Sequence, residues 1–201
     1  MKKYVFLLLI IFFGTLTGCG NEPSLQSLEN GTYHYTHPHA GYSITVPRDW
    51  VKQAEDDTSV AFTGEKPPVV LNIVAEVGGY GYYSMKQLAE EVIYYLGKQF
   101  SNLEAEKLSD DNLTDVYQFT AKGTLKDGAK VEIYTIILEP EVGIRYYLLF
   151  TAPTGDLNVL QGLLQDVAGS FEMIKTKDEL YQQMSNQGEK NEKQGTNPLD
   201  K

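Results

Sequence analysis

The chain has 201 residues, a formal net charge of -10 and one cysteine. This length holds one ordinary domain once the polar ends are set aside. The acidic charge opposes binding to nucleic acid and to anionic lipid headgroups, because both would be repelled. A single cysteine excludes an internal disulfide and a zinc site built on several thiolates.

The N-terminal stretch has the parts of an export signal. Lys2 and Lys3 provide a positive start, and residues 4–13 form an apolar run shorter than the ~20 residues that span a bilayer. The next residues, Leu16-Thr17-Gly18-Cys19, resemble the lipobox of bacterial lipoproteins. This resemblance implies a signal peptide over residues 1–18 and a diacylglyceryl lipid on Cys19. It also implies a mature protein held by that lipid on the extracytoplasmic face of the cell membrane.

Residues 19–32 read as a polar tether with too few apolar residues to fold alone. We expect this tether to space the domain, residues 33–174, away from the membrane.

All three histidines, His34, His37 and His39, lie in one short stretch. Imidazole is a good ligand for zinc, copper and nickel, so a metal site is one interpretation. In a strand, His34 points to the face opposite His37, and only His37 and His39 can share a side. A structural zinc site needs four ligands. The other interpretation is a first strand over residues 33–36, followed by an exposed turn that contains histidines.

The next stretch alternates apolar and polar residues over positions 42–46, which predicts a half-buried strand that ends at Pro47. The only tryptophan, Trp50, then folds back, and we expect it to cover the core. A role in stacking on a ligand or partner is the alternative for this ring.

Several residues of this stretch and of the C-terminal part resemble the PsbP-like family. They are Gly41, Tyr42, Ile44, Pro47, Trp50, Ser170 and Phe171. That family includes the extrinsic PsbP subunit of photosystem II, a nuclear import factor that binds the Ran GTPase, and many bacterial lipoproteins. The resemblance implies an antiparallel sheet with helices on both faces, and a role in binding proteins and assisting complexes rather than in catalysis.

The middle of the chain predicts strands over residues 59–63 and 69–76, and then a glycine-rich loop. The loop carries three tyrosines, Tyr80, Tyr82 and Tyr83. Tyrosine offers a large contact area at low entropic cost, so this loop is a candidate for partner recognition. The alternative is that one or two of the rings cover the start of the next helix.

The best helix is expected over residues 84–101, where Ser84 and Gln87 form a capping box before an apolar stripe. A short strand over 103–108, a hairpin over 115–139 and a strand over 144–150 follow. A last helix is expected over 156–168, with Thr154 as its cap.

Short links force antiparallel pairing, and strands that are apolar on both sides need cover on both faces. The sequence therefore predicts an α+β fold. It consists of one antiparallel sheet of about six to seven strands between helices. Residues 175–201 are polar, and we expect them to begin with a turn or two of helix and otherwise to lack fixed structure.

The sequence offers little for catalysis. A Ser-His-Asp triad needs a histidine beside a nucleophile, whereas the three histidines crowd one early stretch. We therefore expect no enzyme and no cofactor beyond the lipid on Cys19. The expected function is a membrane-anchored lipoprotein that binds a protein partner or assembles a complex in the cell envelope. The alternative is a metal-handling or small-ligand-binding lipoprotein that uses His34, His37, His39 or a pocket near Trp50.

Overall fold

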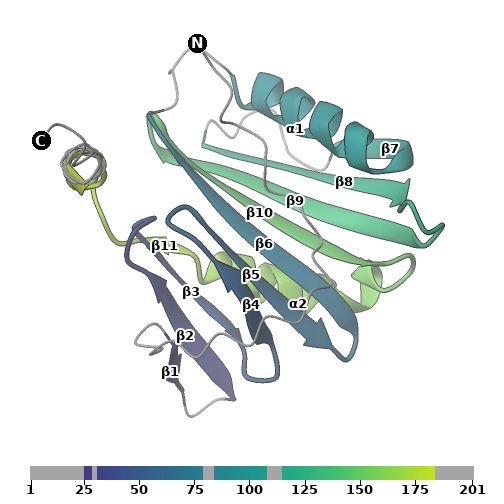
Figure 1. Cartoon of the computed structure of the whole chain (residues 1–201), viewed down its shortest axis with the longest axis horizontal. Coiled ribbons are helices and arrows are strands. Elements are labelled where there is room, and N and C mark those ends of the chain that lie inside the picture. Colours follow the sequence, from purple (N-terminus) through teal and green to yellow (C-terminus); the bar gives the residue numbers. More distant parts are fainter. Residues whose placement is uncertain (1–24, 29–30, 79–83, 108–114, 184–201) are drawn as a thin grey trace, which may run out of the picture.

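The computed structural model describes residues 25–28, 31–78, 84–107 and 115–183. These residues form an α+β fold with two antiparallel sheets (Figure 1). The predicted fold class is confirmed, but the sequence predicts one sheet where the structure has two. No helix in the described ranges is both long and apolar enough to cross a membrane.

The large sheet has seven strands in the order β4-β5-β6-β10-β9-β8-β7. Its strands are β4 (Val51–Glu55), β5 (Ser59–Glu65), β6 (Pro68–Val77), β7 (Ser101–Lys107), β8 (Val116–Thr124), β9 (Lys130–Glu141) and β10 (Ile144–Pro153). The small sheet has the order β1-β2-β3-β11, with β1 (Leu25–Ser27), β2 (Thr32–His37), β3 (Tyr42–Pro47) and β11 (Glu172–Met173).

Strand β10 lies at the centre of the large sheet, between β6 and β9. All of its residues except Pro153 are buried. Because successive side chains of a strand point to opposite faces, burial at consecutive positions means that both faces of the sheet are covered.

One face is covered by helix α1 (Met85–Gln99). The predicted capping box is confirmed: the Ser84 N–H donates to Gln87 Oε1 over 2.9 Å, and the Gln87 N–H donates to Ser84 Oγ over 3.3 Å. The apolar stripe of the helix packs on large side chains of the strands, among them Phe119, Ile133 and Leu149. Burial of such side chains stabilises the fold by roughly 1.5–3 kcal/mol each.

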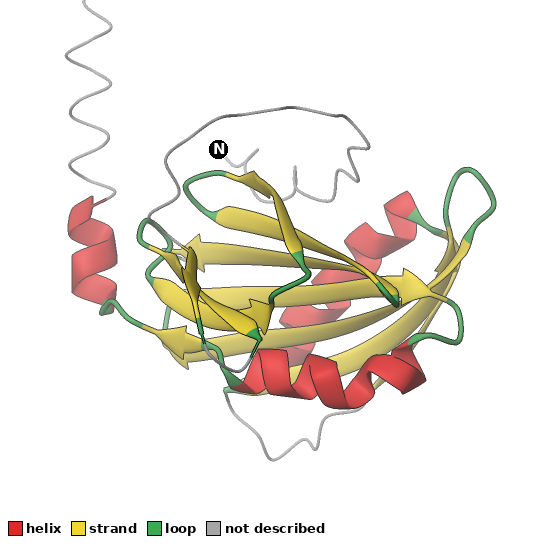
Figure 2. Cartoon of the chain, turned by 90° about the horizontal axis from the view of Figure 1, so that it is seen from below, coloured by secondary structure: helices red, strands yellow, loops and turns green. Residues whose placement is uncertain are grey.

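The other face is covered by helix α2 (Leu157–Gly169) together with the small sheet (Figure 2). The predicted cap of α2 is wrong: the N-cap residue is Asp156 rather than Thr154, and its side chain makes no capping hydrogen bond. Burial of Leu157 and Leu160 against the sheet anchors the N-terminal turns instead. The helix therefore depends on packing more than on its cap.

Several of the residues that carry the resemblance to the PsbP-like family connect α2 to the small sheet. The Thr45 N–H donates to Ser170 Oγ over 2.9 Å, and the Ser170 hydroxyl donates to the Val167 carbonyl over 2.6 Å. The Phe171 ring stacks on the Tyr42 ring, with centres 5.2 Å apart. The closing Ser-Phe pair thus ties the end of α2 to strand β3 across more than a hundred residues of sequence.

The expected tether of residues 19–32 is shorter than predicted. Within it, Leu25–Ser27 forms β1, which pairs with β2 through the registers Leu25↔Tyr35 and Ser27↔Tyr33. The neighbouring Leu28 N–H donates to the Thr32 carbonyl over 2.9 Å. This polar segment joins the small sheet because β2 supplies hydrogen-bond partners for its backbone.

The described part of the expected tail, residues 175–183, contains the predicted turn or two of helix. It differs from the prediction because this helix packs on the domain. Residues 177–183 are helical, and Leu180 is 1% exposed and belongs to the core between α2 and the sheets. A Cβ at Gly41 would lie 2.8 Å from Leu180 Cδ2. Gly41 also has φ +72°, a conformation that favours glycine. The sequence shows Leu180 as an isolated apolar residue, which is a weak signal for docking.

A buried arginine lies on the α1 face of β10. Arg145 is 2% exposed, and its Nε lies 3.2 Å from Glu139 Oε1 and its Nη1 3.6 Å from Glu76 Oε2. The Tyr147 hydroxyl donates to Glu76 Oε2 over 2.8 Å. Burial, and secondarily the Glu76 carboxylate, raise the pKa of Tyr147 well above its usual range. These contacts compensate the burial of the guanidinium charge.

The docking of the C-terminal segment can be tested with Leu180→Ala. Deleting a buried leucine side chain costs about 2–5 kcal/mol of unfolding free energy, so the urea midpoint of the soluble domain should fall clearly. The control is Val159→Ala, since Val159 is 79% exposed on α2. A midpoint unchanged by Leu180→Ala would show that this segment does not contribute to the core.

Candidate functional site

The three histidines occupy different environments in the structure. His37 is fully buried at the end of β2. Its Nδ1 accepts the Ala40 N–H over 3.1 Å, and its Nε2 lies 3.4 Å from the Ser59 carbonyl oxygen. Because Nδ1 is the acceptor, the neutral ring carries its proton on Nε2 and donates it to Ser59. Both ring nitrogens are therefore engaged with main-chain groups, and His37 closes the turn between β2 and β3.

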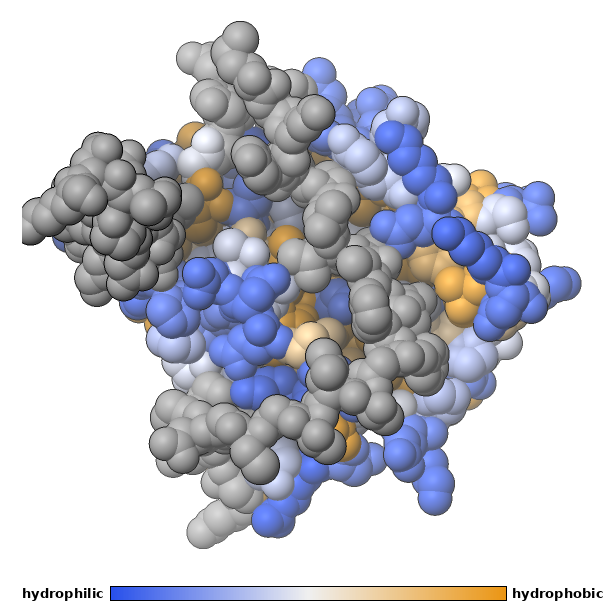
Figure 3. All heavy atoms as spheres, in the orientation of Figure 1, coloured by the Kyte–Doolittle hydropathy of each residue, from blue (hydrophilic) through white to orange (hydrophobic). Residues whose placement is uncertain are grey.

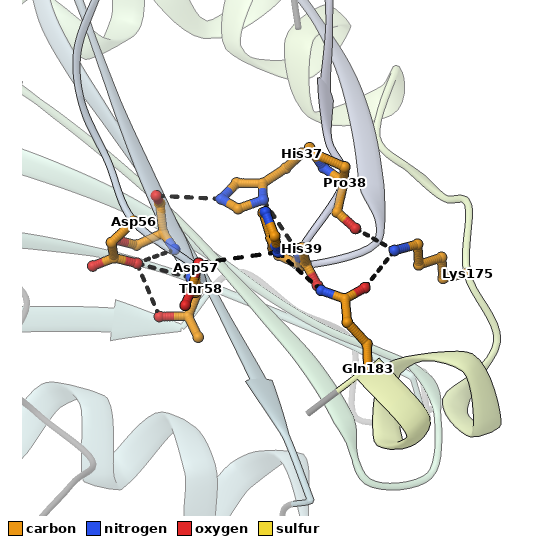
Figure 4. A network of polar contacts seen from close by, with 10 residues as sticks. His37, Pro38, His39, Asp56, Asp57, Thr58, Lys175 and Gln183 are labelled. Carbon is orange, nitrogen blue, oxygen red and sulfur yellow. Dashed lines mark hydrogen bonds and ion pairs between the residues drawn. The ribbon is translucent and has the colours of Figure 1, made fainter. Parts of the chain in front are cut away.

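His39 contacts the C-terminal segment instead (Figure 4). The Gln183 side-chain amide lies 3.0 Å from His39 Nδ1 and 3.3 Å from the His39 carbonyl oxygen. The Lys175 ammonium donates to the Pro38 carbonyl and, over 2.5 Å, to Gln183 Oε1. Asp57 approaches His39 from the other side at 4.0 Å. This network holds the 177–183 helix on the β2–β3 turn.

His34 is half-buried and faces the side of β2 opposite His37, as the strand geometry predicts. It pairs with Gln26 of β1 and Thr45 of β3 in the small sheet. Across the described ranges, no three histidine, cysteine, aspartate or glutamate residues lie together in a way that could hold a metal ion. The structure therefore does not bring the three imidazoles together.

Trp50 is 6% exposed and covers the core, in agreement with the first interpretation of this ring. It packs directly on the backbone of Gly64, where an added Cβ would lie 2.5 Å from the indole Nε1. This close approach explains a glycine in strand β5. The other sequence candidates, Cys19 and the tyrosines Tyr80, Tyr82 and Tyr83, lie outside the described residues.

The outer face of α1 carries an aromatic cluster that the sequence analysis did not single out. Tyr94 is 61% exposed, and its ring lies 5.4 Å from the Tyr95 ring. The Lys98 ammonium sits 4.2 Å from the centre of the first ring and 4.8 Å from the centre of the second. A cation held over aromatic faces is attracted by their quadrupoles. Two adjacent tyrosines outside the apolar stripe of a helix are the sequence signal that was available.

A shallow hollow of about 370 Å³ adjoins this cluster, between the end of α1 and the β8–β9 turn. Its lining includes Lys98, Phe100, Leu125 and Lys126. We refer to Tyr94, Tyr95, Lys98, Leu125 and Lys126 together as the α1–hairpin surface. The right-hand end of the view in Figure 3, where α1 ends and the β8–β9 turn lies, shows hydrophilic residues around a few apolar ones.

The charge of this surface contrasts with that of the chain. Lys98, Lys126 and Lys130 are exposed at this end, next to Asp127. Lys122 is paired with Glu132, with 3.3 Å between Nζ and Oε1. The α1–hairpin surface is thus a lysine-rich region on a protein whose net charge is -10. Tyrosine is enriched at protein interfaces.

A second hollow of about 230 Å³ lies on the opposite face, between α2 and strands β8 and β9. Its floor includes Val116, Ile136 and Leu138. The Tyr134 hydroxyl at its rim donates to Gln118 Oε1 over 2.9 Å. This volume is below that of most small-molecule sites, roughly 300–1,000 Å³.

Comparison with solved structures identifies the fold. The Ran-binding protein Mog1p of Saccharomyces cerevisiae superposes with a TM-score of 0.53 at 11% sequence identity, over 72% of this chain and 96% of Mog1p. The fold is PsbP-like. The match comprises nearly the whole of Mog1p, so the likeness extends over most of the fold.

Two further structures are similar at lower scores. Cyanobacterial PsbP of Synechocystis sp. PCC 6803 gives a TM-score of 0.48 at 15% identity, over 80% of this chain and 98% of that protein. A Bacteroides thetaiotaomicron protein gives 0.48 at 18% identity, over 68% of this chain, which spans only 46% of that protein. The sequence matches no protein-family model and none of the curated proteins.

The burial of His37 predicts a pH dependence of stability. Burial lowers the pKa of His37 below its ordinary value of 6.5. Below pH 6.5 the unfolded chain therefore binds more protons than the folded chain, and stability falls as the pH decreases. In His37→Asn the amide oxygen can still accept the Ala40 N–H, but the side chain cannot take up a proton.

We expect urea unfolding between pH 7.5 and about 5 to show a smaller loss of stability in His37→Asn than in the wild type. The control is His34→Asn, on the opposite face of the same strand. Equal losses in the wild type and in His37→Asn would contradict the assignment of His37 as a buried neutral ring.

Proposed function

We propose that this protein is a lipoprotein of the cell envelope, anchored through Cys19, whose PsbP-like domain binds a protein partner or assists a complex. The domain acts without catalysis, and it uses no cofactor apart from the anchoring lipid. The observation that carries the proposal is the α1–hairpin surface. There, two adjacent tyrosines and exposed lysines stand beside a hollow on an acidic protein.

The chemistry of the surface supports a protein partner. Tyr94 is more than half exposed although it belongs to a helix that has a complete capping box and a buried apolar stripe. A tyrosine ring that the fold itself does not need for its core is available for contact. The lysines favour an acidic region of the partner, because opposite potentials steer association.

Two other points support binding over catalysis. Mog1p, which has the same fold, is a Ran-binding protein. In the described ranges the buried histidine bonds to main-chain groups instead of a nucleophile, so it is not arranged as a general base.

The loop with Tyr80, Tyr82 and Tyr83 precedes α1 in the chain. We propose that this loop contributes to the contact with the protein partner.

The role of the α1–hairpin surface can be tested by site-specific crosslinking in intact cells. A photo-crosslinking residue placed at Tyr94 should give one dominant protein adduct. Adding Lys98→Glu should reduce that adduct by about tenfold or more, because a hot-spot change of 1.4 kcal/mol or more corresponds to that factor.

The matched control places the same crosslinker at Val159, which is 79% exposed on α2. It should give no such adduct. A thermal melt of Lys98→Glu close to that of the wild type shows that the fold is intact. An equal adduct from both positions, or an adduct unaffected by Lys98→Glu, would reject this surface as the binding site.

The anchor is tested independently with Cys19→Ser. The substitution removes the thiol that would carry the lipid, so the protein should move from the membrane fraction to the soluble fraction. At least two acyl chains are needed for stable attachment, since one gives only marginal binding. Mass spectrometry of the wild-type N-terminal peptide should find the diacylglyceryl group. Retention of Cys19→Ser on membranes to the wild-type extent would refute the lipoprotein assignment.

A further inference from the structure

Strand β1 limits how far the domain can stand from its anchor. The strand begins at Leu25 and pairs with β2 through three residue pairs. The chain between the anchor and the folded domain is therefore residues 20–24, rather than the whole stretch up to β2. This limit follows from the pairing and from the number of residues, whatever conformation those residues adopt.

The reach can be calculated from backbone dimensions. Cys19 and Leu25 are six Cα–Cα steps apart, and an extended chain spans at most about 3.6 Å per step, or ~22 Å in total. Without β1 the chain would run free to Thr32, thirteen steps from Cys19, with a limit of ~47 Å. The pairing of three residues therefore halves the length of the tether.

We infer that the β1 edge of the small sheet faces the lipid bilayer that holds Cys19, and that the α1–hairpin surface points away from it. This inference rests on the proposed lipid anchor. In Figure 1, β1 lies at the lower left, whereas the turn between β8 and β9 lies at the far right.

The packing agrees with this separation. The small sheet and α2 cover one face of the large sheet, and α1 covers the other face. The edge of the small sheet and the outer side of α1 are thus on opposite sides of the seven-stranded sheet. The tether holds the β1 edge within ~22 Å of the bilayer surface. The outer side of α1 therefore faces away from the bilayer.

The orientation comes from the tether rather than from attraction to the lipid. The chain is acidic, so electrostatics does not draw it to anionic headgroups. The orientation should therefore be the same on neutral vesicles and at high salt, where exposed charges are screened.

The test uses energy transfer from the lipidated full-length protein to a headgroup acceptor dye in neutral phosphatidylcholine vesicles. Cys19 is the only cysteine, and its thiol is consumed by the lipid, so one introduced cysteine is labelled uniquely. Asp49→Cys places the donor near β1, because the neighbouring Arg48 N–H donates to the Gly31 carbonyl over 3.1 Å. Ala129→Cys places it at the β8–β9 turn.

We expect the transfer efficiency from position 49 to be at least about twofold that from position 129, given the ~22 Å limit on the tether. Gln26→Pro removes a backbone N–H from β1 and should lower the transfer from position 49. Gln26→Val keeps that N–H and should not. Insertion of a flexible Gly-Ser segment between residues 24 and 25 lengthens the tether without altering β1, and should lower the transfer as Gln26→Pro does.

The outcomes separate this inference from the proposed function. Equal transfer from positions 49 and 129 on vesicle-bound protein would overturn the orientation and leave the anchor intact. Unchanged transfer from position 49 in both Gln26→Pro and the insertion variant would overturn the role of β1. Absence of transfer from both positions, with the protein in the supernatant, would refute the lipid anchor and the orientation with it.

Discussion

The fold depends on the burial of both faces of strand β10. Its residues from Ile144 to Ala152 are all buried, and this cannot be achieved by a sheet with one solvated face. Helix α1 supplies cover on one side and α2 on the other, but α2 alone spans only part of the sheet. The small sheet completes the second layer over β5, β6 and β10, with Tyr35, Tyr42 and Ile44 in that core. The N-terminal strands are therefore required by a strand that lies a hundred residues later.

This second layer explains why polar residues are buried there. His37 closes the β2–β3 turn with both ring nitrogens engaged, Ser170 ties α2 to β3, and Leu180 packs against the turn that Gly41 makes possible. The His37 ring and the Ser170 hydroxyl bond to main-chain groups, which offsets the cost of removing these polar groups from water. Of the histidines that suggest a metal site from the sequence, His37 and His39 thus lie at the β2–β3 turn, whereas His34 lies within β2.

The sequence predicts what depends on local patterns. The capping box at Ser84, the apolar stripe of α1, the double-sided burial of β10 and the burial of Trp50 all follow from residue spacing. Prediction from the sequence fails where a segment is ordered by contacts with residues that are distant in the chain. Strand β1 forms because β2 offers a free edge, and the 177–183 helix docks through one leucine and a few hydrogen bonds. The candidate site was not predicted, because it is the exposure of the α1 tyrosines that marks them as a contact surface. Exposure depends on the tertiary structure and cannot be deduced from the local sequence.

The positions of β1 and of the α1–hairpin surface have a consequence for selectivity. Exposed lysines on a membrane-anchored protein are attracted to the anionic lipids of its own membrane, and that attraction decays within a Debye length of about 10 Å. A lysine-rich surface beside the anchor would therefore be occupied by lipid. The small sheet and α1 lie on opposite faces of the large sheet, so under the proposed anchoring we infer that these lysines stand beyond that range. Under that proposal, the charge of the lysines remains available to an acidic region of a protein partner.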